Sequence, residues 1–350
     1  MVGAVLVRGR EVISEGWHRR AGGPHAEIET LCAATQRGER VSGATLYVTL
    51  EPCCTHGRTP PCTEAILAAG IRRVVVAATD PNPNHAGKGL EILRRAGVKV
   101  DLAKATSAVA NEAARLNEAF NHWILQRTPF VTVKAAMTLD GKIATAGGES
   151  KWITGEPARR VAQQLRYDSD AVLVGINTVL ADNPNLTARD PGGRVRKVLQ
   201  RIVLDSLART PLNAMLTSDK FAALTTIVVS RAAPARRVKA LARKVRVLVA
   251  PAQAGRINLR WLLKRLGTGG VTRLLVEGGG EVNASFLEAG LAQRVAFFYA
   301  PKILGGRAAR RGVAGVGAKQ RADLIPLREV EWRRVGEDLM LSARVGQEQN

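Results

Sequence analysis

The stretch "EPCCTHGRTPPC", Glu51 to Cys62, holds three of the four cysteines of the chain within twelve residues. The motif "PHAE", Pro24 to Glu27, precedes it, and the fourth cysteine, Cys32, lies just beyond that motif. The opening "MVGAVLV" is too short for a secretory signal and lacks a basic leader. We therefore expect a cytoplasmic protein with reduced thiols, in which clustered cysteines indicate metal binding or catalysis rather than disulfides.

The residues around both motifs predict alternating helices and strands. The segment "PHAEIETLCAATQRG" is typical of a helix that has Pro24 in its first turn and ends at Gly38. Cys32 is predicted to be a core thiol, because the apolar face of this helix consists of Ile28, Leu31, Cys32 and Thr35. The strand "ATLYVTL" leads into the cysteine loop, and the short helix "CTEAILAAG" follows it.

The same alternation extends over the whole chain. The first part should contain a long helix over about 106–122 and further strands at "VGAVLV", "EVISEGW", "IRRVVVAA" and "VKVDLA". A linker at 124–129 is predicted to join a first domain, 1–123, to a second domain, 130–346. The second domain has strands at "FVTVKAAM", "AVLVG", "RIVLD", "TTIVVS", "VRVLVA", "RLLVE" and "RVAFFYA". Both domains are therefore predicted to be α/β.

Composition restricts the class of protein. The 350 residues are 46% hydrophobic, and no apolar run approaches the ~20 residues of a membrane span. The net charge is +22, but residues 1–125 carry 15 Lys+Arg against 12 Asp+Glu, whereas residues 126–350 carry 37 against 18. The basic part has scattered arginines and few aromatic residues, so we expect no nucleic-acid partner. Affinity for phosphorylated small molecules and an arginine-rich genome are the alternative origins of the charge.

The two motifs together supply the groups of a catalytic zinc site. Such a site has three protein ligands and one water, whose pKa the metal lowers. A deaminase also needs a carboxylate that moves protons from this water to the leaving ammonia. H-x-E followed by P-C…C is typical of zinc-dependent nucleobase deaminases, so we assign His25, Cys53 and Cys62 as ligands. Glu27 is then the proton shuttle.

A structural zinc site with four ligands is the alternative interpretation. It would use Cys54 or His56 in addition, and it leaves Glu27 without a role. Cys54 also competes with Cys53 for the metal. We favour Cys53 because it directly follows Pro52, as the motif requires.

The ligand spacing and several longer motifs carry a family resemblance. Cys53 and Cys62 are nine positions apart, whereas polynucleotide and cytidine deaminases usually have P-C-x-x-C. The insertion "CTHGRTPP", with "HAE" and "DPNPNHAGKG", resembles the deaminase domain of the bifunctional riboflavin-biosynthesis deaminase-reductases. The second half resembles the same family in "VKAAMTLDGKIAT", "GESKWITG", "VLADNPNLTAR", "RIVLDS", "LLVEGGGEVNASFLEAGL" and "APKILGG". The resemblance runs from Val2 to about Gly336.

The resemblance implies two consecutive reactions on small phosphorylated pyrimidines. A three-layer domain similar to cytidine deaminase, with zinc, would hydrolyse the exocyclic amine of 2,5-diamino-6-ribosylamino-4(3H)-pyrimidinone 5′-phosphate. A second domain similar to dihydrofolate reductase would use NADPH to reduce the ribosyl group of the product to ribityl. We expect a homo-oligomer without a membrane partner. Two alternatives stay open: a reductase whose deaminase half is an inactive zinc-stabilised scaffold, and a base deaminase acting on nucleic acid.

The resemblance also implies the residues of the reductase site. The pattern strand, three glycines and helix in "RLLVEGGGEVNASFLEAG" lets backbone amides approach a pyrophosphate. The residues expected at NADPH are Ala136, Trp152, Thr178, Asp182, Ser206, Gly279, Gly280, Glu281, Val282, Asn283, Ala284 and Ser285. Those expected at the substrate, with the arginines on its 5′-phosphate, are Ser150, Arg166, Leu186, Arg189 and Glu277. Lys134 is a polar candidate without an assigned role.

In the deaminase pocket the resemblance implies substrate contacts from His18, Arg58, Asp80 and Asn82. Family members begin with a further helix and a P-N-P-type loop that leads into "VGAVLV", whereas this sequence starts inside that loop. The Asn of the loop normally helps to hold the pyrimidine. We therefore expect efficient reduction, weak deamination, and a less stable first domain with apolar surface uncovered on one face of its sheet.

Overall fold

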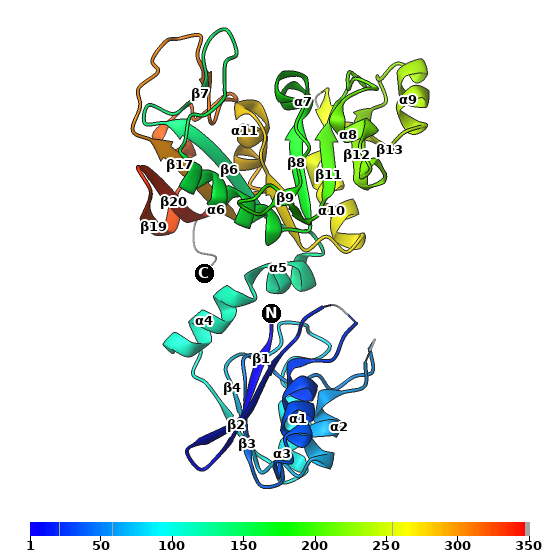
Figure 1. Cartoon of the computed structure of the whole chain (residues 1–350), viewed down its shortest axis with the longest axis vertical. Coiled ribbons are helices and arrows are strands. Elements are labelled where there is room, and N and C mark those ends of the chain that lie inside the picture. The colour runs from blue at the N-terminus through cyan, green and yellow to red at the C-terminus, as the bar shows by residue number, and fades with distance from the viewer. Residues whose placement is uncertain (21, 58, 254, 347–350) are drawn as a thin grey trace. The chain divides into compact units, whose positions relative to one another are not determined.

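The computed structural model describes residues 1–20, 22–57, 59–253 and 255–346. The chain divides into two compact units, Met1–Gln126 and Arg127–Asn350 (Figure 1). This boundary lies within the predicted linker, although residues 124–126 are helical. Arg58, a predicted substrate contact, lies outside the described residues.

The first unit is built on a five-stranded sheet in the order β2-β1-β3-β4-β5. β1 pairs antiparallel with β2 and β3, and β3, β4 and β5 are parallel. The strands are β1 Gly3–Arg8, β2 Glu11–Trp17, β3 Thr45–Val48, β4 Arg73–Val76 and β5 Lys99–Leu102. The helices are α1 Ala26–Gln36, α2 Cys62–Ala68, α3 Lys88–Arg95, α4 Ala108–Leu116 and α5 Glu118–Gln126.

The two faces of this sheet have different surroundings. Helices α1, α2 and α3 cover one face (Figure 1), where alternate strand residues such as Leu6, Leu46 and Val74 are fully buried in the core of the unit. The opposite face has a hollow of about 400 Å³ with an apolar lining that includes Val5, Trp17, Tyr47, Val75 and Val109. His25 directly precedes α1, and Cys62 is the first residue of α2. The helices on the covered face therefore position the metal motifs.

Helix α1 differs from its prediction. It buries a different stripe of residues, namely Ala26, Glu27, Thr30, Leu31 and Ala34. Thr30 can be buried because its hydroxyl donates to the carbonyls of Ala26 and Ala4, at 2.7 and 3.1 Å. Cys32 is exposed, so the prediction of a core thiol was wrong.

The predicted helix over about 106–122 is two helices. α4 ends at Leu116 and α5 begins at Glu118, with Asn117 between them at φ −105° and ψ 10°. Asn117 is buried, and its backbone carbonyl accepts from the amide of Asn121 in the next helix. Asparagine favours such junctions because its short polar side chain competes with the helical backbone for hydrogen bonds.

The second unit is built on a nine-stranded sheet in the order β13-β12-β11-β8-β16-β6-β17-β20-β19. The first seven strands in this order are parallel to one another. β20 pairs antiparallel with both of its neighbours, β17 and β19. The strands are β6 Phe130–Thr138, β8 Ala171–Gly175, β11 Gln200–Leu204, β12 Thr225–Ser230, β13 Arg246–Ala250, β16 Arg273–Val276, β17 Arg294–Ala300, β19 Leu327–Val335 and β20 Asp338–Val345. The sequence reading missed the terminal hairpin β19–β20.

Helices and short hairpins complete the second unit. The helices are α6 Glu156–Tyr167, α7 Ile176–Asp182, α8 Met215–Ser218, α9 Ala235–Ala242, α10 Leu259–Thr268 and α11 Gly280–Glu288. The short strand pairs are β7 Lys142–Ala144 with β18 Arg310–Arg311, β9 Ala188–Arg189 with β10 Val195–Lys197, and β14 Ala252–Gln253 with β15 Arg256–Ile257. In open parallel sheets, ligands bind beyond the carboxyl ends of the strands. Glu277 directly follows β16 at such an end.

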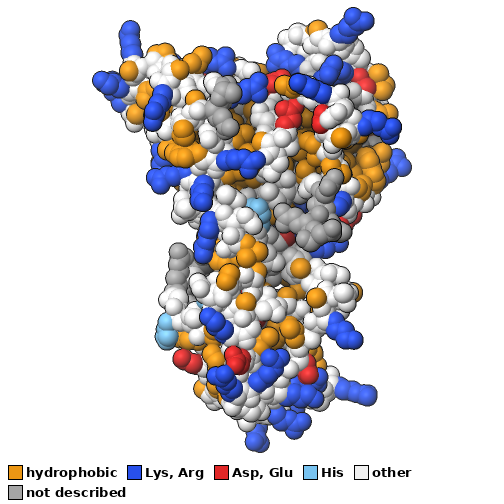
Figure 2. Space-filling model, turned by 180° about the vertical axis from the view of Figure 1, so that it is seen from behind, with side chains coloured by type: hydrophobic (Ala, Val, Ile, Leu, Met, Phe, Trp, Pro, Cys, Tyr) orange, Lys and Arg blue, Asp and Glu red, His pale blue; other side chains and the backbone are white. Residues whose placement is uncertain are grey.

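Basic side chains dominate the surface charge. Figure 2 shows Lys and Arg (blue) over the visible face, with fewer Asp and Glu (red). The segment 220–276, which includes the edge strand β13 and its neighbour β12, contains 13 Lys and Arg and no Asp or Glu. A positive surface of this kind attracts anionic ligands. Within the described ranges, no helix has the length and apolar character required to cross a membrane.

Candidate metal centre and reductase site

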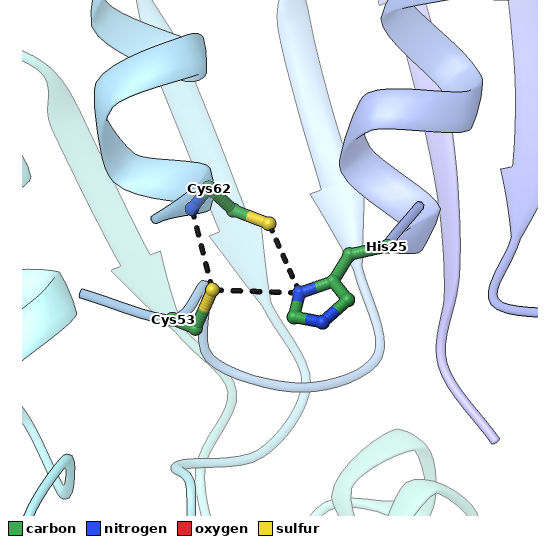
Figure 3. Close-up of side chains that lie close together, drawn as sticks. All are labelled: His25, Cys53 and Cys62. Atoms are coloured by element: carbon green, nitrogen blue, oxygen red, sulfur yellow. Dashed lines mark hydrogen bonds between the residues drawn. The ribbon is translucent and has the colours of Figure 1, made fainter. Parts of the chain in front are cut away.

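Three side chains in the first unit bring their ligand atoms together (Figure 3). Nδ1 of His25 lies 3.4 Å from Sγ of Cys53 and 3.3 Å from Sγ of Cys62. A tetrahedral zinc ion with ordinary Zn–N and Zn–S bonds would separate such atoms by about 3.6 Å. The donor set therefore fits a zinc ion and leaves a fourth position for water.

The local fold explains why these three residues meet. His25 is the extended residue that precedes α1, and Cys62 is the first residue of α2, after Pro61. Cys53 lies in the loop after β3, and the backbone amide of Cys62 donates to its sulfur at 3.3 Å (Figure 3). Thiolates are favoured at helix N-termini, where amides point outward without intrahelical partners.

In the protein without metal, the thiol of Cys53 ionises more readily than the thiol of Cys62. Hydrogen bonding with Cys62 lowers the pKa of Cys53 to about 4, and the interaction with His25 adds to this against the effect of burial. Hydrogen bonding to Cys53 and burial raise the pKa of Cys62. Cys54 and His56 are not part of the ligand group found among the described residues. Burial raises the pKa of Cys54, which opposes its ionisation to a metal ligand.

Glu27 lies two residues after His25 and is 3% exposed. Burial raises the pKa of its carboxyl group to about 7. A carboxyl group with such a pKa can both accept and release a proton near neutral pH. The ring nitrogen of His25 that faces away from the two cysteines, Nε2, lies 3.4 Å from Oγ1 of Thr59.

The predicted substrate contacts of the deaminase pocket have different settings. The ring of His18 lies 5.3 Å from that of His25, and its Nδ1 donates to the carbonyl of Pro24 at 2.9 Å. Asp80 and Asn82 belong to one loop, in which Oδ1 of Asp80 accepts from the amide of Asn82 at 2.8 Å. The structure therefore brings His18 to the metal group, and it connects Asp80 to Asn82.

In the second unit, Glu277 is held by two basic side chains. Arg166 of α6 donates to it from Nε at 2.6 Å and from Nη2 at 3.0 Å. Nζ of Lys134, on β6, lies 3.7 Å from Oε2. Burial opposes the charge of Glu277, but Arg166 and Lys134 outweigh it and lower its pKa to about 2. Burial lowers the pKa of Lys134. The sequence offered Lys134 without a role, and the period-2 alternation of β6 could have placed it beside Ala136.

Arg166 and Arg189, two of the predicted substrate residues of the reductase, share a partner in Thr187. Arg166 also donates to the carbonyl of Thr187 at 3.2 Å, and Arg189 donates to the hydroxyl of Thr187 at 3.0 Å. Leu186 is buried with φ 52°, in the left-handed region. Ser150 donates to Asp182, which ends α7, at 3.1 Å. Thr187 therefore links the two arginines.

A cavity of about 810 Å³ lies along α6 and the hairpin β9–β10. Its lining includes Trp152 and Arg189, together with Arg159, Arg160 and Arg196. Trp152 is exposed, has φ 63°, and carries the guanidinium of Arg159 at 4.5 Å from its ring centre. The volume and the arginines suit an anionic small molecule.

The glycine triplet before α11 has one open position. A Cβ on Gly278 would lie 2.5 Å from the side chain of Val282, and one on Gly280 would lie 2.3 Å from the carbonyl of Arg311. A Cβ on Gly279, the N-cap of α11, would meet nothing within 4 Å. This open turn before the free amides of a helix start fits a phosphate of NADPH.

The remaining predicted cofactor residues are placed less uniformly. Asn283 and Ala284 are fully buried, and Asn283 donates to the carbonyl of Gly312 at 2.8 Å. Ser285 donates to the carbonyl of Glu281. Ser206 follows β11 and accepts from Ser230, which ends the neighbouring β12. Thr178 is half-buried on α7.

Comparison with known proteins identifies the family. A model of the RibD C-terminal domain matches residues 129–341, and a model of the cytidine and deoxycytidylate deaminase zinc-binding region matches residues 1–78. Riboflavin biosynthesis protein RibD of Actinobacillus pleuropneumoniae is 43% identical over 343 residues, which cover 97% of this chain and 88% of that protein. The chain belongs to the RibD family.

Solved RibD structures share this fold. RibD of Acinetobacter baumannii matches with a TM-score of 0.83 at 35% identity, covering 99% of this chain and 92% of that one. A diaminohydroxyphosphoribosylaminopyrimidine deaminase/5-amino-6-(5-phosphoribosylamino)uracil reductase of Thermotoga maritima matches with a TM-score of 0.79 at 33% identity, covering 98% and 91%. The predicted fold class is confirmed: a cytidine-deaminase-like unit precedes a dihydrofolate-reductase-like unit, as in RibD.

Proposed function

We propose that this chain catalyses two consecutive steps of riboflavin biosynthesis. The first unit hydrolyses the exocyclic amine of 2,5-diamino-6-ribosylamino-4(3H)-pyrimidinone 5′-phosphate. The second unit reduces the ribosyl side chain of that product with NADPH and yields 5-amino-6-ribitylamino-2,4(1H,3H)-pyrimidinedione 5′-phosphate. Family membership over nearly the whole chain supports both steps. We also propose that the protein acts in the cytoplasm as a homo-oligomer. Light scattering after size-exclusion chromatography tests the oligomeric state.

For deamination, His25, Cys53 and Cys62 would hold zinc, which supplies an acidified water when bound. Glu27 accepts a proton from that water at its carboxylate and delivers it to the leaving amine. Its pKa of about 7, raised by burial, suits both transfers. His18, Asn82 and Arg58 are the proposed pyrimidine and phosphate contacts, and Asp80 lies in one loop with Asn82.

For reduction, the start of α11 around Gly279 would hold the phosphates of NADPH, which supplies a hydride when bound. Arg189 and Arg166 are proposed at the 5′-phosphate and ribosyl part of the substrate, with Leu186 and Ser150 next to them. Glu277 orients the sugar hydroxyls as an ionised acceptor. Lys134 is the proposed proton donor to the sugar oxygen, because burial lowers its pKa and weakens its hold on the proton.

One observation carries the deaminase half of the proposal. Among the residues that the structure describes, the metal group has three protein ligands rather than four, and a buried carboxyl group, Glu27, lies two residues from His25. A purely structural zinc site is closed by a fourth protein ligand and needs no such acid. The arrangement therefore supports catalysis over a scaffold role.

Mass spectrometry of the products tests both steps. The diamino substrate is incubated with the purified protein, with and without NADPH. Without NADPH, we expect a product in which oxygen has replaced the amine. With NADPH, the same product should gain two hydrogens. Reduction of a supplied deaminated intermediate, with no reaction of the diamino substrate, would instead identify a reductase with an inactive first unit.

A further inference from the structure

Glu51 is a buried acid that the proposed chemistry does not use. It is 4% exposed and lies two residues before the zinc ligand Cys53. Its Oε2 accepts from the backbone amides of Asp80 and Gly87 at 3.1 and 2.9 Å, and its Oε1 accepts from Gly89 at 2.9 Å. One carboxylate therefore holds both ends of the loop 80–89, about thirty residues further along the chain.

The loop 80–89 lies in close backbone contact with the segment that carries Cys53. A Cβ on Gly89 would lie 2.3 Å from the carbonyl oxygen of Pro52 and 3.2 Å from Oε1 of Glu51. Only glycine permits this contact between the two backbones. The loop 80–89 is thus docked directly against the residues that carry Cys53.

A second attachment lies on the other side of Cys53. His85 contacts Oδ2 of Asp80 through Nδ1 at 3.2 Å and Oγ1 of Thr55 through Nε2 at 2.8 Å. A carboxylate only accepts, so Nδ1 donates to Asp80, and in the neutral ring Nε2 accepts from the Thr55 hydroxyl. Thr55 lies two residues after Cys53, as Glu51 lies two residues before it. The zinc ligand is therefore flanked by two residues that hold the same loop.

These contacts give Asp80 and Asn82 different roles. Both carboxylate oxygens of Asp80 are engaged within the loop, Oδ1 by the amide of Asn82 and Oδ2 by His85. In the hydrogen bonds among described residues, the side chain of Asn82 uses only its oxygen, which accepts from the amide of Asn84 at 3.1 Å. The NH₂ group of Asn82 is left to donate to a ligand. Asp80 holds the loop, and Asn82 presents the donor.

We propose that Glu51 and His85 are positioning residues that fasten the loop 80–89 to the cysteine loop and thereby set how tightly the deaminase holds its pyrimidine substrate. The inference rests on the proposed function, because it assigns the loop to the substrate site of the deaminase. Docking at two points fixes the donor of Asn82 relative to the metal. Loss of either point lets the loop move away while the three metal ligands stay in place.

Steady-state kinetics of ammonia release tests the proposal, with His85→Ala compared with Asn84→Ala. Asn84 is the matched control, because it lies in the same loop and, in the hydrogen bonds of the described part of the chain, its backbone amide is the group that is used. We expect His85→Ala to raise KM for the diamino substrate about 10-fold with little change in kcat, since the hydrogen bonds to the charged Asp80 and to Thr55 are both lost. Zinc content and reduction of the deaminated intermediate should match wild type. Asn84→Ala should match wild type in all four measurements.

Four further variants keep the test specific to the contacts. Thr55→Val should raise KM, and the double variant with His85→Ala should be no worse than His85→Ala alone, because His85→Ala already removes the hydrogen bond to Thr55. His85→Gln, which can still reach Thr55, should recover part of the loss. Glu51→Gln should raise KM at least as much as His85→Ala, with zinc retained. The NH₂ group of the glutamine would face backbone amides, which need an acceptor at that position.

The outcomes separate this inference from the proposed function. A KM for His85→Ala equal to that for Asn84→Ala overturns the inference alone, as does additive loss in the double variant. Loss of zinc in His85→Ala also overturns it, since the contacts would then serve the metal site. Wild-type protein that releases no ammonia overturns the proposed deaminase and this inference with it.

Discussion

Arg166 donates two parallel hydrogen bonds to the carboxylate of Glu277, across 111 positions of sequence. The pair joins α6 to the end of β16, directly before the glycines that precede α11. Both side chains are largely buried, with 17% and 10% of their surface exposed. Removing one partner therefore leaves the other as a buried charge with weaker compensation.

Arg166→Lys should lower the rate of reduction by about tenfold or more, because lysine cannot make the two parallel bonds of the guanidinium. NADPH oxidation with the deaminated intermediate measures this effect. Ammonia release from the diamino substrate should be unchanged and serves as the internal control. Arg265→Lys, at an exposed position of α10, is the matched variant and should reduce as wild type does. Equal rates for both variants would contradict the role of the pair.

Glu277→Gln should change the pH dependence of stability. The folded pKa of Glu277 is about 2, below its ordinary value of 4.5, so its contribution is fully present above 4.5 and is lost as the pH falls toward 2. In urea unfolding followed by circular dichroism, we expect the gap between wild type and Glu277→Gln to be largest near neutral pH. The gap should shrink as the pH falls below 4.5. A gap that is constant with pH would show that Glu277 does not ionise as a pair with Arg166.

Cys62→Ala should remove the metal and abolish deamination, because Cys62 is one of the three ligands. Cys54→Ala should retain about one zinc per chain and full activity. Metal analysis of the purified variants gives the answer directly. Loss of zinc in Cys54→Ala with retention in Cys53→Ala would reverse the ligand assignment.

Glu27→Gln should retain zinc and lose deamination by ~10²-fold or more, because the amide cannot carry the proton. Reduction of the deaminated intermediate should continue at the wild-type rate. Ammonia release and NADPH oxidation are measured on the same preparation. A parallel fall of both activities would contradict the assignment of one reaction to each unit.

The metal residues were predictable because their chemistry leaves a local mark in the sequence. His25 and Glu27 are two positions apart, and Cys53 directly follows Pro52, so the motif names them before any fold is known. The central strands were equally visible. β8 and β16 are apolar runs because both faces of a parallel sheet are covered.

Other features depend on contacts that the local sequence does not encode. Cys32 has the character of a core residue, but the inward face of α1 is chosen by the packing of Thr30 against β1. β19 is exposed along nearly its whole length, so it has no alternation of apolar and polar residues to detect. The attachment of Glu51 to Gly89 joins a side chain to a distant backbone amide, and a backbone amide leaves no mark in the local sequence.

The strand order of the second unit determines how this protein can fold while it is being made. All strands of the first sheet lie within residues 3–102, so that sheet and its metal ligands can assemble once Gln126 has left the ribosome. β6 is the first strand of the second sheet to be synthesised, yet its neighbours β16 and β17 end only at Val276 and Ala300. At roughly 5–20 residues per second, β6 waits on the order of ten seconds or more for its partners. During that interval the apolar central strand β6 has unpaired edges, whereas the first unit already has its complete five-stranded sheet.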